Sequence, residues 1–262
     1  MTRLSDMVRL VRAPNPSPLT LEGTNTYVIG ERMPIVIDPG PAIDEHLEAV
    51  LDEAGQPSLV LLTHHHPDHA EGAERFAAMA RAPLAMYADH PPGVCATAAA
   101  IADGQRIDVD GTALVTVYTP GHSSDHLSFY LEAERALLTG DHVLGRGTTV
   151  VAHPDGDMAA YMRSLERARD LHATKLYPGH GPIVDEPDAV LDYYIAHRIE
   201  REQQVLGAID AGLGEVGEMV ERIYAAYDRA LHAAAALSVR AHLGKLADDG
   251  VVARRDGRWV RV

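Results

Sequence analysis

Residues 63–69 read Thr63-His64-His65-His66-Pro67-Asp68-His69, and the apolar run 58–62 directly precedes them. In an extended chain, side chains two residues apart point the same way. We therefore expect His64 and His66 to converge on one metal ion, while Asp68 and His69 turn toward a second ion. By the same alternation, His65 should point away from both ions.

Three further segments end a short apolar strand with a glycine beside a ligand-type residue. They are 115–122, which ends in Pro120-Gly121-His122, 136–141, which ends in Gly140-Asp141, and 175–180, which ends in Pro178-Gly179-His180. Glycine lets the chain turn sharply where a ligand must face inward. Sites collect at strand ends in layered α/β folds. Four such endings favour one metal site over a chance clustering of histidines.

The HxHxDH signature formed by His64, His66, Asp68 and His69 resembles that of the metallo-β-lactamase superfamily. The resemblance covers about residues 20–185 and implies an α/β fold, the αβ/βα four-layer sandwich. It implies a first metal on His64, His66 and His122, a second on Asp68, His69 and His180, and Asp141 as a bridge between them. Asp68 and Asp141 are the expected catalytic residues.

Mixed histidine and carboxylate ligands suit zinc, although iron or manganese can occupy the same ligands. We expect two divalent metal ions, with Zn2+ as the default. Such a pair, about 3.5–4 Å apart, lowers the pKa of a bridging water toward about 7. A metal-bridging hydroxide would then be the nucleophile. Several β-lactamases of the superfamily carry cysteine where Asp141 stands, and the single cysteine here is Cys95, so antibiotic hydrolysis is disfavoured.

Several other residues are candidates for supporting roles. Asp38 resembles the family's aspartate that steadies the ligand loop by hydrogen bonds, with an ordinary Asp-Pro-Gly turn as the alternative. His126 either donates a proton to the leaving group or is a strand residue near the site. Four residues are candidates for binding an anionic substrate group, although each is also typical of a surface or of helix packing: Arg146, His153, His197 and Arg198.

The remaining pattern predicts two domains, a catalytic domain over 1–200 and a winged-helix-like domain over 201–262. Strand-like runs alternate with helix-like runs in the first domain, and aspartates suited to N-capping begin several of the helices. The expected strands are 26–29 and 35–37, and the expected helices are 44–54, 68–80, 157–171, 188–211, 215–227 and 232–249. Asp256-Gly257 predicts a two-residue hairpin turn.

Charge bears on the role of the C-terminal domain. Arg254, Arg255, Arg258 and Arg261 could contact nucleic acid, or the domain could be a cap that shapes the substrate cleft. The chain has a net charge of −15, whereas residues 198–262 hold ten Lys or Arg and ten Asp or Glu. A duplex binder usually shows a broad basic face. The balance therefore disfavours DNA binding.

Segments 140–149, 177–182 and 196–198, with the winged-helix-like ending, resemble the lactamase-beta-like-2 group. That group includes endoribonucleases acting on single-stranded RNA, and close relatives release polyketides from carrier proteins as thioesterases. We expect a small ester or thioester, free or carrier-bound. The alternatives are an endoribonuclease on single-stranded RNA and a non-catalytic metal-sensing DNA-binding regulator. The acidic catalytic part, with two Phe and one Trp in the whole chain, disfavours RNA.

Nothing in the sequence predicts a membrane partner. No apolar run approaches twenty residues, and Arg3, Asp6, Arg9 and Arg12 interrupt the first apolar residues. We expect a cytoplasmic location. The alanine-rich helices near the C-terminus leave a homo-oligomer open as an alternative to internal packing.

Overall fold

A computed structural model describes the backbone of residues 1–262 and every side chain except that of Ala230. The strands are β1 (Thr2–Arg3), β2 (Val8–Arg12), β3 (Asn25–Ile29), β4 (Ile35–Ile37), β5 (Leu59–Leu61), β6 (Leu84–Tyr87), β7 (Ala99–Ile101), β8 (Arg106–Val109), β9 (Thr112–Tyr118), β10 (Leu127–Leu131), β11 (Ala136–Gly140), β12 (Lys175–Pro178), β13 (Val252–Arg255) and β14 (Arg258–Arg261). The helices are α1 (Asp44–Ala54), α2 (Pro67–Ala70), α3 (Ala73–Ala80), α4 (Met158–Asp170), α5 (Pro187–Asp210), α6 (Val216–Ile223) and α7 (His232–Asp248), with a 3₁₀ turn at Arg229–Leu231.

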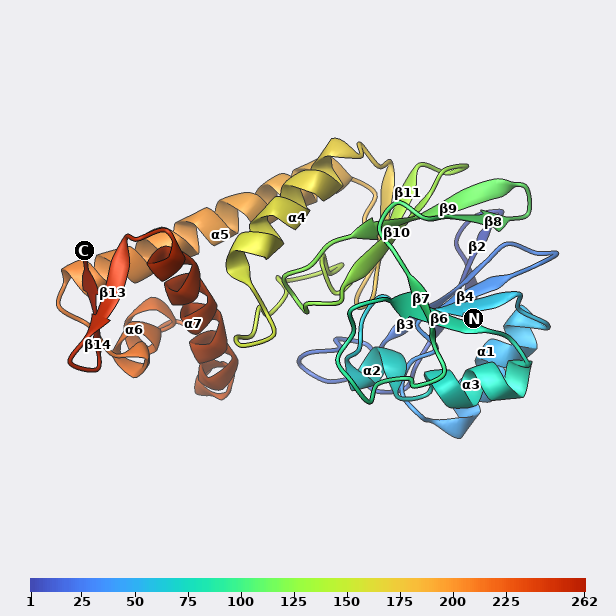
Figure 1. The fold of residues 1–262 in the computed structure, drawn as a ribbon, viewed down its shortest axis with the longest axis horizontal. Coiled ribbons are helices and arrows are strands. Elements are labelled where there is room, and N and C mark those ends of the chain that lie inside the picture. Colours follow the sequence, from blue (N-terminus) through green and yellow to red (C-terminus); the bar gives the residue numbers. More distant parts are fainter.

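Two sheets face each other between outer helices, which confirms the predicted four-layer α/β sandwich (Figure 1). One sheet runs β1 to β7 in order, and the other runs β12-β11-β10-β9-β8. Ile35 and Ile37 of β4 point into the core between the sheets, where Phe129 also lies. Val36, between them, packs outward with Leu47 of α1. Strands covered on both faces are apolar at successive positions, which explains the continuous run in β4.

The predicted helix 68–80 is instead two helices, α2 and α3. The backbone N–H of Gly72 donates to the carbonyl of Gly40 at 2.9 Å, so the chain leaves the helical path to bond the loop that follows β4. Propensity could not predict this break, because the bonding partner lies more than thirty residues away in the sequence. The break separates the ligand-bearing turn α2 from the packing helix α3.

The N-capping prediction holds for Asp157 and not for Asp44 or Asp68. Asp157 caps α4, since its carboxylate accepts a hydrogen bond from the backbone N–H of Ala160 at 2.8 Å. Asp44 lies within the first turn of α1, and the N-cap residue there is Ile43, without a side-chain bond. Asp68 also lies inside its helix, where it is free to face the candidate site. An acidic residue in a first turn still opposes the positive end of the helix dipole.

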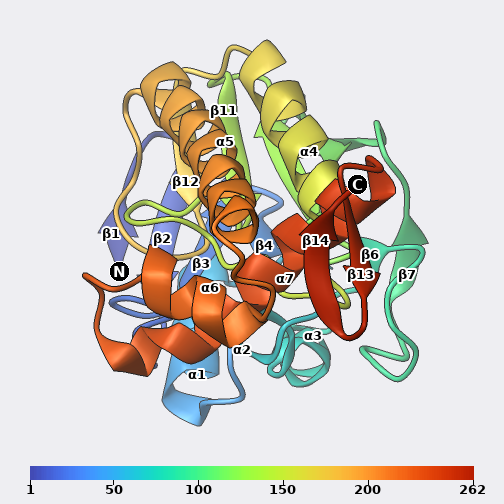
Figure 2. The same ribbon diagram turned by 90° about the vertical axis from the view of Figure 1, so that its left-hand side faces the viewer.

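Helix α5 joins the sandwich to the C-terminal module. Its first half packs with α4 through Leu191 and Tyr194. Its second half packs with α6 and α7 through Val205 and Ile209. Figure 1 shows α5 running from the sheets to the red C-terminal elements, and in Figure 2 these elements face the viewer. The boundary predicted at residue 200 falls inside this continuous helix and stays a prediction.

The C-terminal module is the expected pair of helices and hairpin, and its turn has the predicted geometry. Arg255 pairs with Arg258, so the loop holds only two residues. Asp256 and Gly257 have φ of 48° and 82°, the left-handed conformation at both positions of a type I′ turn.

None of the described helices combines the length and the apolar character that a membrane-spanning segment needs.

Replacing Gly121 tests the close packing next to His122. Its φ is +131°, and an added Cβ would lie 2.4 Å from the backbone of Tyr161 in α4. We expect Gly121→Ala to lower the free energy of unfolding by about 3 kcal/mol, because both strain and overpacking result. Urea unfolding measures the change.

Gly207→Ala is the matched control, because no atom lies within 4 Å of its added Cβ in the exposed face of α5. It should raise stability by about 0.5–1 kcal/mol. Equal effects of the two alanines would contradict the packing argument.

Candidate metal centre

Seven side chains predicted as ligands meet at one edge of the sandwich. His64 follows β5, and His66, Asp68 and His69 come from the turn that becomes α2. His122 follows β9, Asp141 follows β11, and His180 follows β12. Each strand ends near this edge, so segments far apart in sequence deliver their polar residues to one place.

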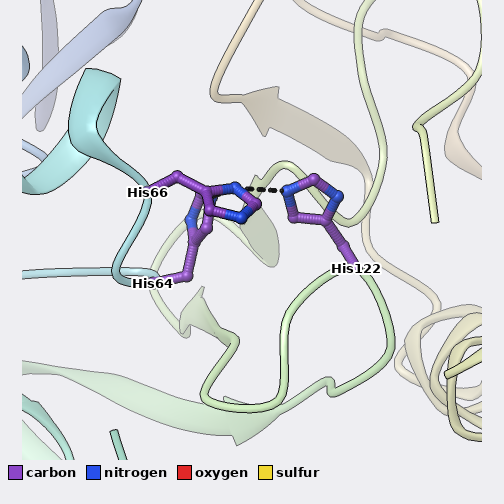
Figure 3. Close-up of side chains that lie close together, drawn as sticks. All are labelled: His64, His66 and His122. Atoms are coloured by element: carbon purple, nitrogen blue, oxygen red, sulfur yellow. Dashed lines mark hydrogen bonds between the residues drawn. The ribbon is translucent and has the colours of Figure 1, made fainter. Parts of the chain in front are cut away.

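The first group consists of three imidazole rings. The Nδ1 atom of His66 lies 3.0 Å from Nε2 of His64 and 2.9 Å from Nε2 of His122. Figure 3 shows the His66 and His122 rings turned toward each other from separate loops. Nitrogens around one tetrahedral zinc, each 2.0–2.1 Å from the ion, stand about 3.3 Å apart. The spacing therefore fits a shared cation.

The second group combines two rings with two carboxylates. The Nε2 atom of His180 lies 3.2 Å from Nε2 of His69, 3.1 Å from Oδ2 of Asp68 and 3.3 Å from Oδ1 of Asp141. All four ligand-type atoms lie within 4.8 Å of one another. The group thus offers a second metal a mixed nitrogen and oxygen ligand set, as zinc, iron or manganese accepts.

Asp141 faces both groups with different oxygens. Its Oδ1 points to His69 and His180, and its Oδ2 lies 3.7 Å from Nε2 of His122. Oδ1 is buried, and the two imidazole rings that it faces are its only close polar neighbours among the described residues. A buried carboxylate oxygen costs free energy when nothing compensates its charge. The donor set and this oxygen therefore fit a cation on each side of the carboxylate.

Protonation differs between the groups. Burial and neighbouring rings lower the pKa of His66 to about 4, and burial lowers that of His64 well below its usual value. These rings are neutral and keep a lone pair for a metal. Burial alone would lower the pKa of His180, yet the Asp141 charge and bonds to both carboxylates raise it to about 9. The carboxylates thus draw positive charge into the second group.

Asp38 holds the ligand segment from behind, and it is 2 % exposed. Its Oδ2 lies 2.8 Å from Nδ1 of His69 and accepts the Thr63 hydroxyl at 2.7 Å, while Oδ1 accepts the Thr63 N–H at 2.8 Å. The Thr63 Oγ1 atom also lies 2.9 Å from Nδ1 of His64. Because these contacts occupy the Nδ1 atoms, the Nε2 atoms of both rings face the site. Sequence reasoning missed Thr63, although it directly precedes the signature.

Two further groups orient ligands from behind. The carbonyl of Val150 lies 2.8 Å from Nδ1 of His122. His126 is fully buried, and its Nε2 accepts the backbone N–H of Asp141 at 3.2 Å. His126 therefore supports the segment that carries Asp141, and proton donation by His126 stays a prediction. A backbone carbonyl such as that of Val150 leaves no signal in a sequence.

His65 lies apart from the two groups, as its alternation predicted. Its Nδ1 is 2.9 Å from Oδ1 of Asp125, and this hydrogen bond raises the His65 pKa. With His66 and Asp155 it forms a third set of ligand-type atoms. The His65 Nε2 atom lies 3.9 Å from Asp155. Because His66 already belongs to the first group, this set is the weaker candidate.

A cleft of about 350 Å³ opens over both groups. Arg146 lines it, but its guanidinium lies 2.7 Å from the Glu22 carboxylate. His153 instead lines a groove beside the winged-helix module. His197 and Arg198 line a neighbouring cavity between α5 and α7. Of the four candidates for substrate binding, only Arg146 reaches the cleft over the metal groups.

The basic edge of the hairpin is partly neutralised. Arg258 lies 2.8 Å from Glu218, and Arg261 lies 3.0 Å from Asp210. These ion pairs attach the hairpin to α6 and α5. They reduce the positive charge that a nucleic-acid phosphate would meet.

Replacing Asp38 tests the support behind His69. An amide nitrogen donates hydrogen bonds and cannot accept them. In Asp38→Asn, one of the three donors that bond the Asp38 carboxylate therefore loses its acceptor, and the His69 ring loses its orientation. We expect divalent-metal affinity to fall by about 10–100-fold. Competition with a chromophoric chelator measures it.

Asp125→Asn is the control, because Asp125 is also buried beside a histidine, but that histidine is His65. It should bind metal like the wild type. A loss confined to Asp125→Asn would contradict the proposed support.

Comparison with known proteins agrees with this geometry. The metallo-beta-lactamase superfamily model matches residues 19–180, and the beta-lactamase associated winged helix domain matches 216–259. A beta-lactamase-like protein 2 homolog of Caenorhabditis elegans is 36 % identical, covering 95 % of this chain and 87 % of its own. An atrochrysone carboxyl ACP thioesterase of Aspergillus fumigatus is 40 % identical, covering 79 % and 66 %.

The fold comparison covers nearly the whole chain. A crystal structure of a metallo-beta-lactamase family protein from Thermus thermophilus superposes with a TM-score of 0.84 at 24 % identity, covering 99 % of this chain and 100 % of the other. The two family models and the 36 % identical relative carry the assignment, and the fold agrees with it. The chain belongs to the metallo-β-lactamase superfamily and ends in its associated winged-helix domain.

Proposed function

We propose that the chain is a dinuclear metal-dependent hydrolase of ester or thioester substrates. His64, His66 and His122 would hold one ion, Asp68, His69 and His180 the other, and Asp141 would join them. The single observation that carries this proposal is the division of the two Asp141 oxygens between the two groups. When bound, such a pair supplies a water of lowered pKa and positive charge for the developing oxyanion.

The reaction would be addition of water to an acyl carbon. The water oxygen forms the new C–O bond, the C–S or C–O bond of the substrate breaks, and a carboxylic acid and a thiol or alcohol leave. Asp68 lines the cleft, and its side chain is 29 % exposed. We assign to Asp68 the transfer of a proton from the attacking water to the leaving sulfur or oxygen, through the carboxylate oxygen that does not face His180. Its pKa is held at about 2, since the charge of His69 and the bond to His180 outweigh burial.

The walls of the cleft favour an acyl group over RNA. Leu19, Leu21, Leu144 and Leu237 line it together with Val150. Burying such apolar side chains against a hydrocarbon chain is favourable. A phosphate backbone would instead require several cations. In this cleft Arg146 is already paired with Glu22. The similarity to a protein named as a carrier-protein thioesterase supports the same choice.

Asp141→Asn tests the dinuclear centre. Loss of one negative charge and one bridging oxygen should leave fewer than two metals per chain, counted by plasma emission spectroscopy. We expect hydrolysis to fall more than about 100-fold. Thioester, lactone and single-stranded RNA should be assayed side by side, with the thioester cleaved fastest by the wild type.

Asp155→Asn is the matched control, since Asp155 lies near the first group but outside the proposed ligands. It should keep both metals and its activity. Metal-independent turnover, or RNA cleavage faster than thioester cleavage, would reject the proposed function.

Leu237→Asn tests the apolar wall. We expect kcat/KM for an octanoyl thioester to fall about tenfold relative to an acetyl thioester, because one apolar contact of about 1–2 kcal/mol is lost. Ile199→Asn changes a comparably exposed side chain that lies on α5 outside the cleft, and it should leave the ratio unchanged. An unaltered chain-length profile in Leu237→Asn would place the acyl chain elsewhere.

A further inference from the structure

A second cavity of about 360 Å³ lies beside the metal cleft, between α5 and α7, and we call it the arginine cavity. Arg198 and Arg201 line it from successive turns of α5, and Tyr193, Tyr224 and Tyr227 complete its wall. None of the described residues that line it is acidic. The chain as a whole has a net charge of −15.

Both arginines are buried without a carboxylate partner. Arg198 is 3 % exposed and Arg201 is 6 % exposed. The ion pairs among the described residues include neither, although Lys245, on the facing helix α7, lies 2.9 Å from Glu202. The Nε atoms of both guanidiniums are buried without any hydrogen-bond partner. A buried cation is costly unless an anion compensates it, so these groups lack their counter-charge.

The guanidiniums are nevertheless held in place. Arg198 donates to the carbonyl of Thr149 and lies 5.1 Å from the Tyr161 ring centre. Arg201 donates to the Gln204 side chain and lies 4.3 Å from the Tyr224 ring centre. Stacking on an aromatic face fixes the plane of the guanidinium and leaves its edge available for an oxyanion.

The charges of the two arginines also lower the pKa values of neighbouring histidines. Burial, then the charges of Arg198 and Arg201, lower the pKa of His197 to about 4 and that of His242 to about 3. Both ring nitrogens of His242 are buried without a partner. Arg198 and Arg201 thus place two positive charges between α5 and α7, in a cavity whose described lining holds no acidic residue.

The arginine cavity and the metal cleft share a wall. Residues 147–150 and Ala234 line both. The same loop makes hydrogen bonds to both sites. The Thr149 carbonyl accepts from Arg198, and the Val150 carbonyl lies 2.8 Å from Nδ1 of His122. A substrate extending past this loop would place one group in each site.

We propose that the arginine cavity binds an oxyanion, a phosphate or a carboxylate of the acyl substrate, while the scissile bond lies over the metal centre. This inference rests on the proposed function. Arg201 would be the main ligand, because Arg198 is also tied to the loop behind His122. A planar guanidinium matches both oxyanions by paired N–H donors.

Paired substrates that differ in one anion test this. Butyryl-pantetheine is compared with butyryl-4′-phosphopantetheine, and succinyl-pantetheine with butyryl-pantetheine. In the wild type, at least one anionic member should have a kcat/KM about tenfold higher than its neutral partner. Arg201→Gln should reduce that ratio to about one, and Arg201→Lys should keep part of it. The pair affected tells whether the anion lies on the thiol side or the acyl side.

Arg240→Gln is the control, because Arg240 is exposed on α7 and lines a different groove. It should leave both ratios unchanged. Ratios near one in the wild type, or a ratio unaffected by Arg201→Gln, would overturn the inference while the neutral thioester is still hydrolysed.

Binding separates this inference from the proposed function. Calorimetric titration with 4′-phosphopantetheine and with succinate requires no turnover, and Arg201→Gln should weaken the binding of one of them about tenfold. Absence of thioester hydrolysis with such binding intact would reject the proposed function alone. Binding of single-stranded RNA that depends on Arg201, with neither small anion bound, would overturn the acyl substrate in favour of a nucleic-acid phosphate.

Discussion

The candidate metal centre depends on one buried carboxylate, that of Asp38. A charged group at 2 % exposure must be fully hydrogen bonded, and Asp38 meets this condition with the Thr63 N–H, the Thr63 hydroxyl and the His69 ring. These bonds determine which nitrogen of His69 faces the cleft. Through Thr63 they also orient His64. The αL conformation of Asp38, with φ of 52°, turns its side chain toward the ligand segment.

Close packing of the backbone also positions the other candidate ligands. Gly179 lies so close to the site that an added Cβ would be 2.7 Å from Oδ1 of Asp141 and 2.8 Å from Cε1 of His69. The chain between β12 and His180 can therefore approach the Asp141 carboxylate only without a side chain. Helix α5 then fastens the loop behind His122 through Arg198, so one helix connects the metal cleft with the winged-helix module.

Local sequence predicted the parts of the site whose partners are near in the chain or follow from strand alternation. His64, His66 and His65 point as the two-residue period requires, and the Asp256-Gly257 turn follows from backbone preferences alone. The interruption at Gly72 was not predictable in this way, because the bond to Gly40 forms only when the two loops meet. The hydrogen bond from the Asp141 N–H to His126 was not predictable for the same reason.

The sequence by itself determined the ligand types, their order at strand ends and the alternating apolar pattern that makes two sheets pack face to face. Tertiary structure alone decided that each Asp141 oxygen faces a different ligand group and that Arg146 forms an ion pair with Glu22. It also decided that Arg198 and Arg201 share a cavity without a counter-charge. The physical reason is that hydrophobic periodicity specifies which face of an element is buried, whereas the distance between charges on different elements depends on how those faces pack.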